Sequence, residues 1–400
     1  MWTRRRFLAL AGGLAGGAAL GGCTERAVVG VPDRLLVDTA AGPALVRGTA
    51  AKPLGTALAI PAGTGVWATR AAGADTVLES IAPTTGEATG RALLPGRWIP
   101  RVASPDGGLV ALSQPRDPAG GDGPYRPTGQ HVSTILVADA AGVRYRLELP
   151  GDLEPDAFAR AGAALFVLER LHGPDRYRVR LVDLGARAFT ELLTRDKRPV
   201  PVGTEEQMYA TGRVAVLNPA GTVQYTLYQQ ERGPKIPGES PAFVHTLDLS
   251  VGWAYCLELP ESLGNGPAEA LTLAVTPDGR RVAVADLSSG HLAIADADTL
   301  TVRDDLDIPH GTGTAYAVAR PASELLYLGS GTDIAVVDLG ILHTVSRWPA
   351  GGPVRGLAVS ADGTRLLVGY PGAVGWLDSG SGKPLGRVAL PGLTELRRTV

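Results

Sequence analysis

Cysteine and histidine are the residues of this chain best able to do chemistry, and both are scarce: the 400 residues include two cysteines and six histidines. Cys23 directly follows an apolar segment, rich in Ala, Gly and Leu, that starts after Arg6. Its thiol is the group in this segment that can form a thioether with a lipid. Its type and position therefore make Cys23 a candidate for lipid attachment.

The four residues that end at this cysteine, Leu20-Gly21-Gly22-Cys23, resemble the lipobox of bacterial lipoproteins. The resemblance implies cleavage after Gly22, diacylglyceryl and palmitate groups on Cys23, and attachment to the extracytoplasmic face of the cell membrane. The apolar run is about 16 residues long, shorter than the ~20 that a spanning helix needs, which favours a removed signal peptide over residues 1–22. An ordinary signal peptide with a chance cysteine is the alternative.

The basic start of the chain, Thr3-Arg4-Arg5-Arg6-Phe7-Leu8, resembles the twin-arginine export motif. Arg4 and Arg5 would be the paired arginines of that motif, and Phe7 and Leu8 its apolar pair. The glycine-rich, weakly hydrophobic segment that follows also favours this route, which carries proteins already folded in the cytoplasm. Export through the Sec pathway with a basic leader is the alternative.

Composition limits the partners of the mature chain. Without residues 1–22 the chain has 378 residues, and loss of three arginines changes its net charge from −2 to −5. A net negative chain offers no sign of binding to nucleic acid. Arginine greatly outnumbers lysine, and alanine, glycine and valine are abundant, which is typical of a GC-rich genome such as that of an actinobacterium.

Signals for catalysis are weak in the mature chain. Cys256 lies in a strand-like segment and is expected to be a buried, inert thiol, since no second cysteine remains for a disulfide. The histidines are scattered, and none pairs at a metal-ligand spacing. No nucleophile elbow or phosphate-binding glycine loop occurs. We therefore predict no catalytic residue, no metal site and no cofactor.

A repeated strand–turn–strand unit dominates the sequence. Segments 101–111, 273–284 and 357–368 each carry two apolar runs around a turn of the type Pro-Asp-Gly or Ala-Asp-Gly. Proline presets φ, aspartate bonds to the backbone ahead, and glycine accepts a positive φ. A later strand of each unit ends in Asp before another turn, as at Asp296 and Asp378. An Asp that recurs once per unit at a turn is expected to form that turn.

Four strands per unit, at about 40–45 residues, match a β-propeller blade. Turns near residues 62, 106, 161, 220, 278, 322 and 362 predict seven blades over residues 54–392. The repeat resembles those of YVTN-type and WD40-like propellers, which implies an all-β propeller fold. No literal Tyr-Val-Thr-Asn string occurs, so the resemblance supports the architecture better than any one family.

The two ends of the predicted ring are ambiguous. Val31 to Val37 repeats the start of a blade, but the next turn comes only 29 residues after Asp33, too soon for four strands. Residues 23–53 could thus hold an extra hairpin or a ring-closing strand. They could also belong to an eighth blade that residues 393–400 complete. Seven blades are favoured and eight are the alternative; residues 393–400 are a tail or a closing strand.

Four long insertions, at residues 114–131, 171–177, 194–212 and 229–242, predict one binding face over blades two to four. Loops on a rigid scaffold often carry binding. The candidate residues of this face are Arg116, Tyr125, Arg126, His172, Arg198, Arg232 and Lys235. We expect a binding or scaffold module for a protein or cell-envelope ligand. An exported enzyme, lactonase-like or redox, and an accessory subunit of a membrane complex are the alternatives, because fold does not fix function.

Overall fold

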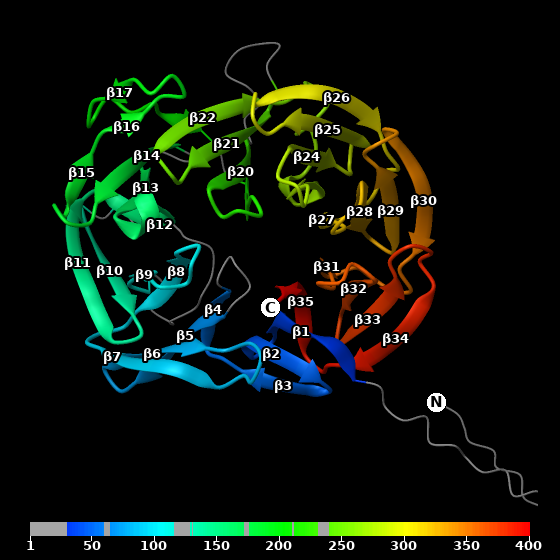
Figure 1. Ribbon diagram of the computed structural model, residues 1–400, viewed down its shortest axis with the longest axis horizontal. Helices are drawn as coiled ribbons and strands as arrows, with labels where there is room; N and C mark the ends of the chain where they lie inside the picture. The colour runs from blue at the N-terminus through cyan, green and yellow to red at the C-terminus, as the bar shows by residue number, and fades with distance from the viewer. Residues whose placement is uncertain are drawn as a thin grey trace, which may run out of the picture.

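The computed structural model describes residues 30–59, 65–115, 129, 131–171, 176–209, 212–230 and 240–400. The predicted leader lies outside these residues. That leader includes Arg4, Arg5, Phe7 and Leu8 of the export motif, Leu20, Gly21 and Gly22 of the lipobox, and the predicted lipidation site Cys23. The remaining chain forms a ring of antiparallel sheets around a central axis (Figure 1).

Each sheet is a blade whose first strand lies nearest the axis and whose fourth lies at the rim (Figure 1). Blade 1 contains β4 (Thr56–Ala59), β5 (Val66–Ala72), β6 (Asp75–Ile81) and β7 (Ala88–Leu94). Blade 2 contains β8 (Ile99–Ala103), β9 (Val110–Ser113), β10 (Val132–Asp139) and β11 (Gly142–Pro150). Blade 3 contains β12 (Asp152–Ala159), β13 (Ala164–Arg170), β14 (Arg176–Asp183) and β15 (Ala188–Thr190). Blade 4 contains β19 (Gly212–Leu217), β20 (Val223–Gln229), β21 (Ala242–Asp248) and β22 (Trp253–Glu258).

The second half of the ring is more regular. Blade 5 contains β23 (Leu271–Val275), β24 (Arg281–Asp286), β25 (His291–Asp296) and β26 (Thr301–Asp307). Blade 6 contains β27 (Tyr316–Ala319), β28 (Leu325–Ser330), β29 (Asp333–Asp338) and β30 (His343–Pro349). Blade 7 contains β31 (Leu357–Val359), β32 (Arg365–Tyr370), β33 (Ala373–Asp378) and β34 (Pro384–Ala389).

The last blade joins the two ends of the chain. Blade 8 has the strand order β35 (Leu393–Thr399), β1 (Val31–Thr39), β2 (Gly42–Gly48) and β3 (Ala50–Pro53). Leu35 pairs with Thr399 and Leu36 with Arg398. Next to β35, Gly356 has φ +111° and leaves no room for a Cβ beside the carbonyl oxygen of Leu396. This closure leaves no open edge between the first and last blades.

The predicted count of seven blades is wrong, and the alternative of eight is confirmed. Six of the seven turns used for the count join the first and second strands of blades 2 to 7, and the one near residue 62 lies outside the described residues, between β4 and β5. Blade 8 takes its first strand from the C-terminus. Only three of its strands precede blade 1, which explains the short 29-residue spacing after Asp33. The propeller therefore extends beyond residues 54–392 at both ends.

Apolar side chains pack between neighbouring blades and form the core. Leu292 of blade 5 and Leu326 of blade 6 belong to one buried cluster, and Tyr327 of blade 6 and Leu366 of blade 7 belong to the next. Each sheet thus buries both faces against its neighbours, which is why its middle strands are nearly continuous apolar runs. Burial of this kind is the main favourable term for folding.

The repeated aspartates form turns, as predicted. In the first-to-second turns, the hydroxyls of Ser104, Thr276 and Ser360 each donate to the carboxylate two residues later, at 2.5–2.6 Å. In the third-to-fourth turns, the carboxylate accepts from backbone N–H groups two or three residues ahead. These carboxylates belong to Asp139, Asp183, Asp248, Asp296, Asp338 and Asp378.

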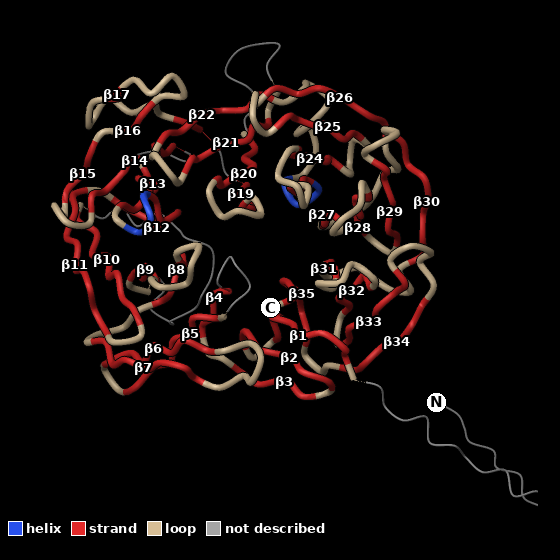
Figure 2. Tube along the Cα trace, viewed as in Figure 1, coloured by secondary structure: helices blue, strands red, loops and turns tan. Residues whose placement is uncertain are grey.

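Short elements interrupt this pattern mainly between blades 3 and 4. β16 (Leu192–Leu193) and β17 (Pro199–Val200) extend the sheet of blade 4, and β18 (Met208–Tyr209) pairs with β14. The described residues contain little helix (Figure 2): the 3-10 turns η1 (Arg160–Gly162) and η2 (Ala268–Ala270). Within the described part of the chain, no helix is long and apolar enough to cross a bilayer.

Candidate functional site

The first strands of all eight blades surround a central cavity of about 830 Å³. Each first strand runs from one end of the ring to a turn at the other end, which we call the turn end. The cavity reaches the turn end, because Pro105, Gly221 and Pro321 from three of these turns line it. This cavity, the channel, is the site that the fold builds most directly.

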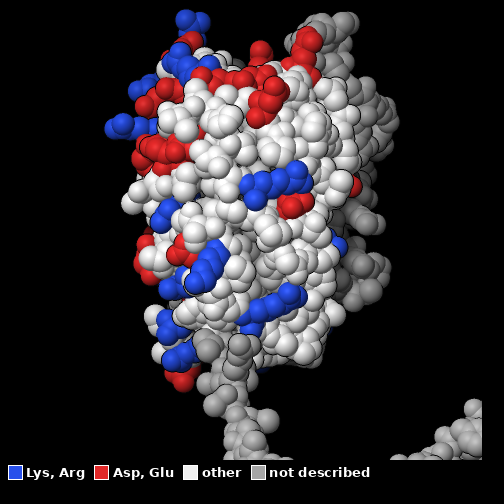
Figure 3. Space-filling view, turned by 90° about the vertical axis from the view of Figure 1, so that its right-hand side faces the viewer, with Lys and Arg blue, Asp and Glu red and all other residues white. Residues whose placement is uncertain are grey.

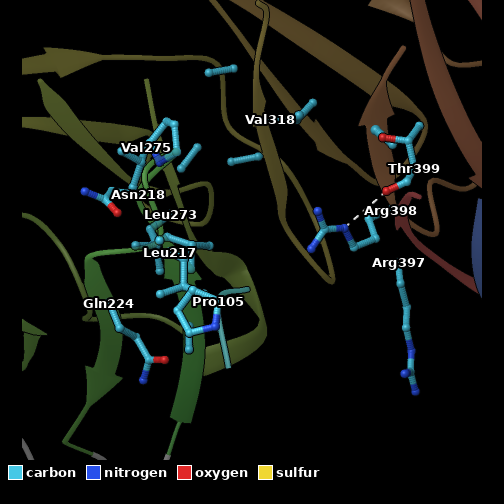
Figure 4. A pocket seen from close by; sticks show the side chains of 18 of the residues that line it. Pro105, Leu217, Asn218, Gln224, Leu273, Val275, Val318, Arg397, Arg398 and Thr399 are labelled. Carbon is cyan, nitrogen blue, oxygen red and sulfur yellow. Dashed lines mark hydrogen bonds between the residues drawn. The ribbon is translucent and has the colours of Figure 1, made fainter. Parts of the chain in front are cut away.

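Most of the channel wall is apolar. Leu273 and Val275 come from β23 and Val318 from β27 (Figure 4). Leu357 of β31 also lines the channel. These strands belong to blades 5, 6 and 7, which follow one another around the ring. The first strand of each blade pairs with a neighbour along one edge, and its other edge faces the axis. The apolar side chains on these strands do not fill the space around the axis, so the channel stays open.

Three guanidinium groups also line the channel, on blades 2 and 8, which flank blade 1. Arg101 Nε donates to Ser113 Oγ at 2.7 Å, and Arg398 Nε donates to the carbonyl of Thr399 at 3.2 Å (Figure 4). Arg397 forms an ion pair with Asp38 at 2.5 Å. Burial lowers the pKa of Arg398, because the surrounding protein disfavours its charge.

One carboxylate lies among the residues that line the channel. Asp156 of β12 is 5 % exposed, and its Oδ1 accepts from Gln224 Nε2 at 3.1 Å. A register shift between Pro155 and Ala157 sets Asp156 out of the β12–β13 ladder. The lining residues thus include three arginines and a single acid, and the partner of Arg397, Asp38, lies outside the lining.

A second acidic group, Glu395, lies earlier on β35. Burial raises the pKa of Glu395, the nearby Asp38 raises it further, and Arg397 and Arg355 act in the opposite direction. Glu395 and Arg397 alternate along one strand. The charge of β35 therefore changes from acidic to basic towards the turn end.

A buried ion-pair network holds the segment between blades 3 and 4 against blade 3. Arg180 contacts Glu169 and Glu205, both at 3.2 Å, and Arg178 contacts Glu169 at 2.7 Å. The side chain of Glu205 is 2 % exposed. Buried charges of this kind are tolerated when each has a partner, so the network fixes where this insertion lies.

The structure describes one of the seven residues of the predicted binding face, Arg198. Arg116, Tyr125, Arg126, His172, Arg232 and Lys235 lie outside the described residues. Arg198 is exposed and belongs to a turn at the turn end, whereas the second strands that precede the other three insertions, β9, β13 and β20, end at the opposite end. Leu193 pairs there with Trp253, and Arg195 donates to the carbonyls of Asp298 and Thr299.

The reason for this difference is a hairpin within the insertion. Because the segment from Thr194 to Gly212 joins two blades, its connectivity predicts that it lies at the same end of the ring as the other insertions. Instead, β16 and β17 fold back beside the third-to-fourth turns, and only β18, near the end of the insertion, reaches the end where β14 begins.

Cys256 is partly buried, less than the sequence predicts, and its surroundings disfavour the reactive thiolate form. Burial, followed by the carboxylates of Glu206 and Glu258, raises its pKa to about 12. Its nearest recorded partner is Met208, whose sulfur lies 4.0 Å away. Among the described residues, no group of three or more His, Cys, Asp or Glu side chains is placed to hold a metal.

The rim of the ring carries charges of both signs. On the side that includes β30, lysines and arginines alternate with acidic side chains (Figure 3), and Arg347 pairs there with Asp333 at 2.8 Å. Exposed pairs of this kind contribute little to stability. They also leave this side without a uniform charge, so the channel is the stronger candidate site.

Sequence reasoning missed the channel residues Arg101, Asp156, Gln224, Arg397 and Arg398. The sequence does contain a signal for them. These residues are polar, whereas the residues at the equivalent positions of blades 5 to 7 are apolar. This signal can be used only when the innermost strand of each blade is known. For Arg397 and Arg398 it must also be known that β35 is the first strand of blade 8.

No protein-family profile and no curated protein matches the sequence. Several solved structures share the fold. The dihydro-heme d1 dehydrogenase NirN in complex with DHE is 13% identical, with a TM-score of 0.55 over 92% of this chain and 75% of that chain. AztD from Citrobacter koseri is 12% identical, with a TM-score of 0.55 over 92% and 96%.

A eukaryotic initiation factor is also similar, at 12% identity and a TM-score of 0.51 over 91% of this chain and 97% of that one. At these identities the likeness concerns the fold only. This chain is therefore a β-propeller with four-stranded blades, and it shares this architecture with a dehydrogenase, AztD and an initiation factor.

Proposed function

We propose that this protein is a membrane-anchored extracytoplasmic lipoprotein whose propeller is a binding module, with the channel as its binding site. The observation that carries the proposal is the cavity of about 830 Å³ to which all eight blades contribute. Ligand sites are commonly concave, largely apolar and equipped with a few polar groups, as this channel is. The anchor rests on the lipobox-like residues that end at Cys23.

The proposed anchor also orients the ring. β1 is the second strand of its blade, so Val31 lies at the turn end, where Asp33 pairs with Arg365 at 3.1 Å. The seven residues from Thr24 to Gly30 span at most about 25 Å. Lipid on Cys23 would therefore hold the turn end, and the channel opening with it, close to the membrane.

Affinity capture from membranes tests this proposal. The intact protein and a Cys23→Ser variant would each be expressed with a C-terminal tag and fractionated. We expect the intact chain in the membrane fraction and the variant in the soluble extracytoplasmic fraction. A Cys23→Ser protein that stays firmly membrane-bound would contradict the anchor, and an intact protein that retains neither a small molecule nor a partner would contradict the binding role.

An exported enzyme is the competing proposal, and its support is the predicted twin-arginine route together with the fold shared with a dehydrogenase. Spectroscopy and elemental analysis of the purified protein distinguish the enzyme from the binding module. An absorption band from a bound chromophore, or a stoichiometric metal in elemental analysis, would favour a redox role over a simple binding role.

A further inference from the structure

We infer that the channel takes a small amphipathic anion, an acidic group joined to an apolar body. This inference rests on the proposed binding function and names the ligand class for the same site. It follows from how charge and apolar surface are divided between the two sides of the channel, as Figure 4 shows for Arg397 and Arg398 on one side and Leu273 and Val275 on the other.

The cationic side comes from two blades that flank blade 1. Arg101 lies on β8 of blade 2, and Arg397 and Arg398 lie on β35 of blade 8. Arg397 is held by Asp38 and by the carbonyl of Ala57, at 2.5 and 3.0 Å, which fixes its position on the wall. Guanidinium groups bind carboxylates and phosphates through paired hydrogen bonds, so this side suits an acidic group.

The apolar side comes from the opposite part of the ring. In a ring of eight blades, blade 5 faces blade 1, and the lining residues of blades 5 and 6 include Leu273, Val275 and Val318 and no charged side chain. The one lining carboxylate, Asp156, lies on blade 3 and is hydrogen-bonded to Gln224. An anion with an apolar tail could meet both kinds of wall at once, whereas an inorganic anion would meet only one.

The size of the channel sets the scale of the ligand. Small-molecule pockets usually measure about 300–1,000 Å³, and this cavity of about 830 Å³ lies in that range. A single acyl chain or a ring system with one acidic group fits such a volume, and a whole folded domain does not. The same chemistry could reach the channel as a free carboxylate or as part of a membrane lipid.

Titration calorimetry tests the ligand class on the full-length Cys23→Ser protein, which can be handled without detergent. The probes are decanoate, octanoate, acetate and 1-decanol. We expect decanoate to bind, acetate not to bind, and 1-decanol to bind at least about tenfold more weakly than decanoate. Full burial of two further CH₂ groups would make decanoate up to about fifteenfold tighter than octanoate.

Charge-removing variants identify the side of the channel that binds the acid. Arg398→Gln and Arg101→Gln should each weaken the binding of decanoate about tenfold or more. The binding of 1-decanol should stay unchanged, which also shows that each variant is folded. Arg146→Gln is the matched control, because Arg146 lies on β11 at the rim with its side chain 56% exposed. Unchanged decanoate affinity in both channel variants would overturn the inference.

Other outcomes separate this inference from the proposed function. Equal affinity for 1-decanol and decanoate, or capture of a protein partner by a chain that binds no decanoate, would overturn the anionic ligand and leave a binding module. Absence of every ligand and partner would overturn both. Mass spectrometry of an organic extract from the membrane-purified protein then distinguishes the sources, since a free fatty carboxylate and a phospholipid have different masses.

Discussion

At the scale of single residues, this chain uses its acidic side chains mostly to order backbone. Asp278 accepts a 2.6 Å hydrogen bond from the hydroxyl of Thr276, and this bond is the main reason that its pKa is lowered. Asp106 and Asp362 each accept a hydrogen bond from a serine hydroxyl two residues earlier, and the pKa of each carboxyl is also lowered. The regular recurrence of aspartate therefore reflects turn formation and not a set of catalytic carboxylates.

The turn at Thr276 gives the first prediction. Thr276→Val keeps the shape of a buried side chain but removes its bond to Asp278 and the acceptor for the N–H of Arg281 at 3.0 Å. We expect the free energy of unfolding in urea at pH 7 to fall by about 1–2 kcal/mol. Thr332→Val, at an exposed turn position, is the control and should change little.

The same variant has a pH signature. Because the folded pKa of Asp278 is lower than the unfolded one, its contribution to stability is present above about pH 4 and is lost as the pH falls through the folded pKa. The gap between the native protein and Thr276→Val should therefore narrow below about pH 4. A gap that widens in acid would contradict this role for the hydroxyl.

Cys256 gives the second prediction. With a pKa of about 12, roughly one thiol in ten thousand is a thiolate at pH 8, and the thiolate is the reactive form. In the Cys23→Ser protein, where Cys256 is the sole cysteine, iodoacetamide should label the native chain far more slowly than it labels glutathione. Mass spectrometry should find complete labelling once urea unfolds the chain; rapid labelling of the native protein would refute the assignment.

At the scale of elements, closure of the ring depends on β35. Its Leu396 is 2 % exposed and packs in one cluster with Val37 of β1 and Val388 of β34. Leu396 N also donates to the carbonyl of Arg355 at 2.6 Å, beside blade 7. One short strand thus connects the two ends of the chain through contacts on both sides.

Truncation of this side chain gives the third prediction. Leu396→Ala should lower the free energy of unfolding by about 2–5 kcal/mol, because it leaves a cavity in a packed core. Leu385→Ala removes the same atoms from a side chain that is 50% exposed, and a change within about 0.5 kcal/mol is expected there. Equal losses in the two variants, measured by urea unfolding, would show that β35 is not a packed closing strand.

The insertion between blades 3 and 4 gives the fourth prediction. Glu205→Gln removes a carboxylate charge that contacts the buried Arg180 and the partly buried Arg178. We expect the free energy of unfolding to fall by about 2–4 kcal/mol, because Glu169 still pairs with both arginines. Limited proteolysis should cut residues 201–207 in the variant before the ring unfolds. Glu191→Gln, at an exposed position, is the control. A variant as stable and as resistant to proteolysis as the native chain would show that the ion-pair network does not hold this insertion in place.

The extent to which sequence predicts this fold follows from how local each signal is. The turns at Asp106, Asp278 and Asp362 involve contacts a few residues apart, so residue types alone reveal seven first-to-second turns. The pair Leu35–Thr399 joins residues at opposite ends of the chain, and no local pattern marks it. That difference explains why blade 8 stayed an alternative.

The candidate site is less predictable for a related reason. Arg101 alternates with apolar neighbours as any strand residue could, and only the closed ring places its strand across the channel from β27, which carries Val318. Arg198 was grouped with loops by connectivity, yet the pairing of Leu193 with Trp253 puts it at the other end. Both cases depend on tertiary position, which a pattern along one strand does not carry.

At the scale of the whole molecule, strand direction relates the anchor to the channel. Every first strand ends at the turn end, and β1 begins there because it is a second strand. The proposed lipid on Cys23 would therefore restrain the end of the ring that the channel reaches. The proposed ligand class agrees with this arrangement, since a membrane is a source of amphipathic anions.

Orientation on the membrane gives the last prediction. In a Cys256→Ser background, single cysteines at Arg280 or Thr364, which are exposed at the turn end, would carry a fluorophore, and Thr332, exposed at the opposite end, would serve as the control. In vesicles with nitroxide-labelled headgroups, we expect quenching at 280 and 364 and little at 332, because the strands between the two ends separate them by about 20 Å. Stronger quenching at 332 would mean that the channel opens away from the bilayer, and a ligand would then have to enter from the aqueous side.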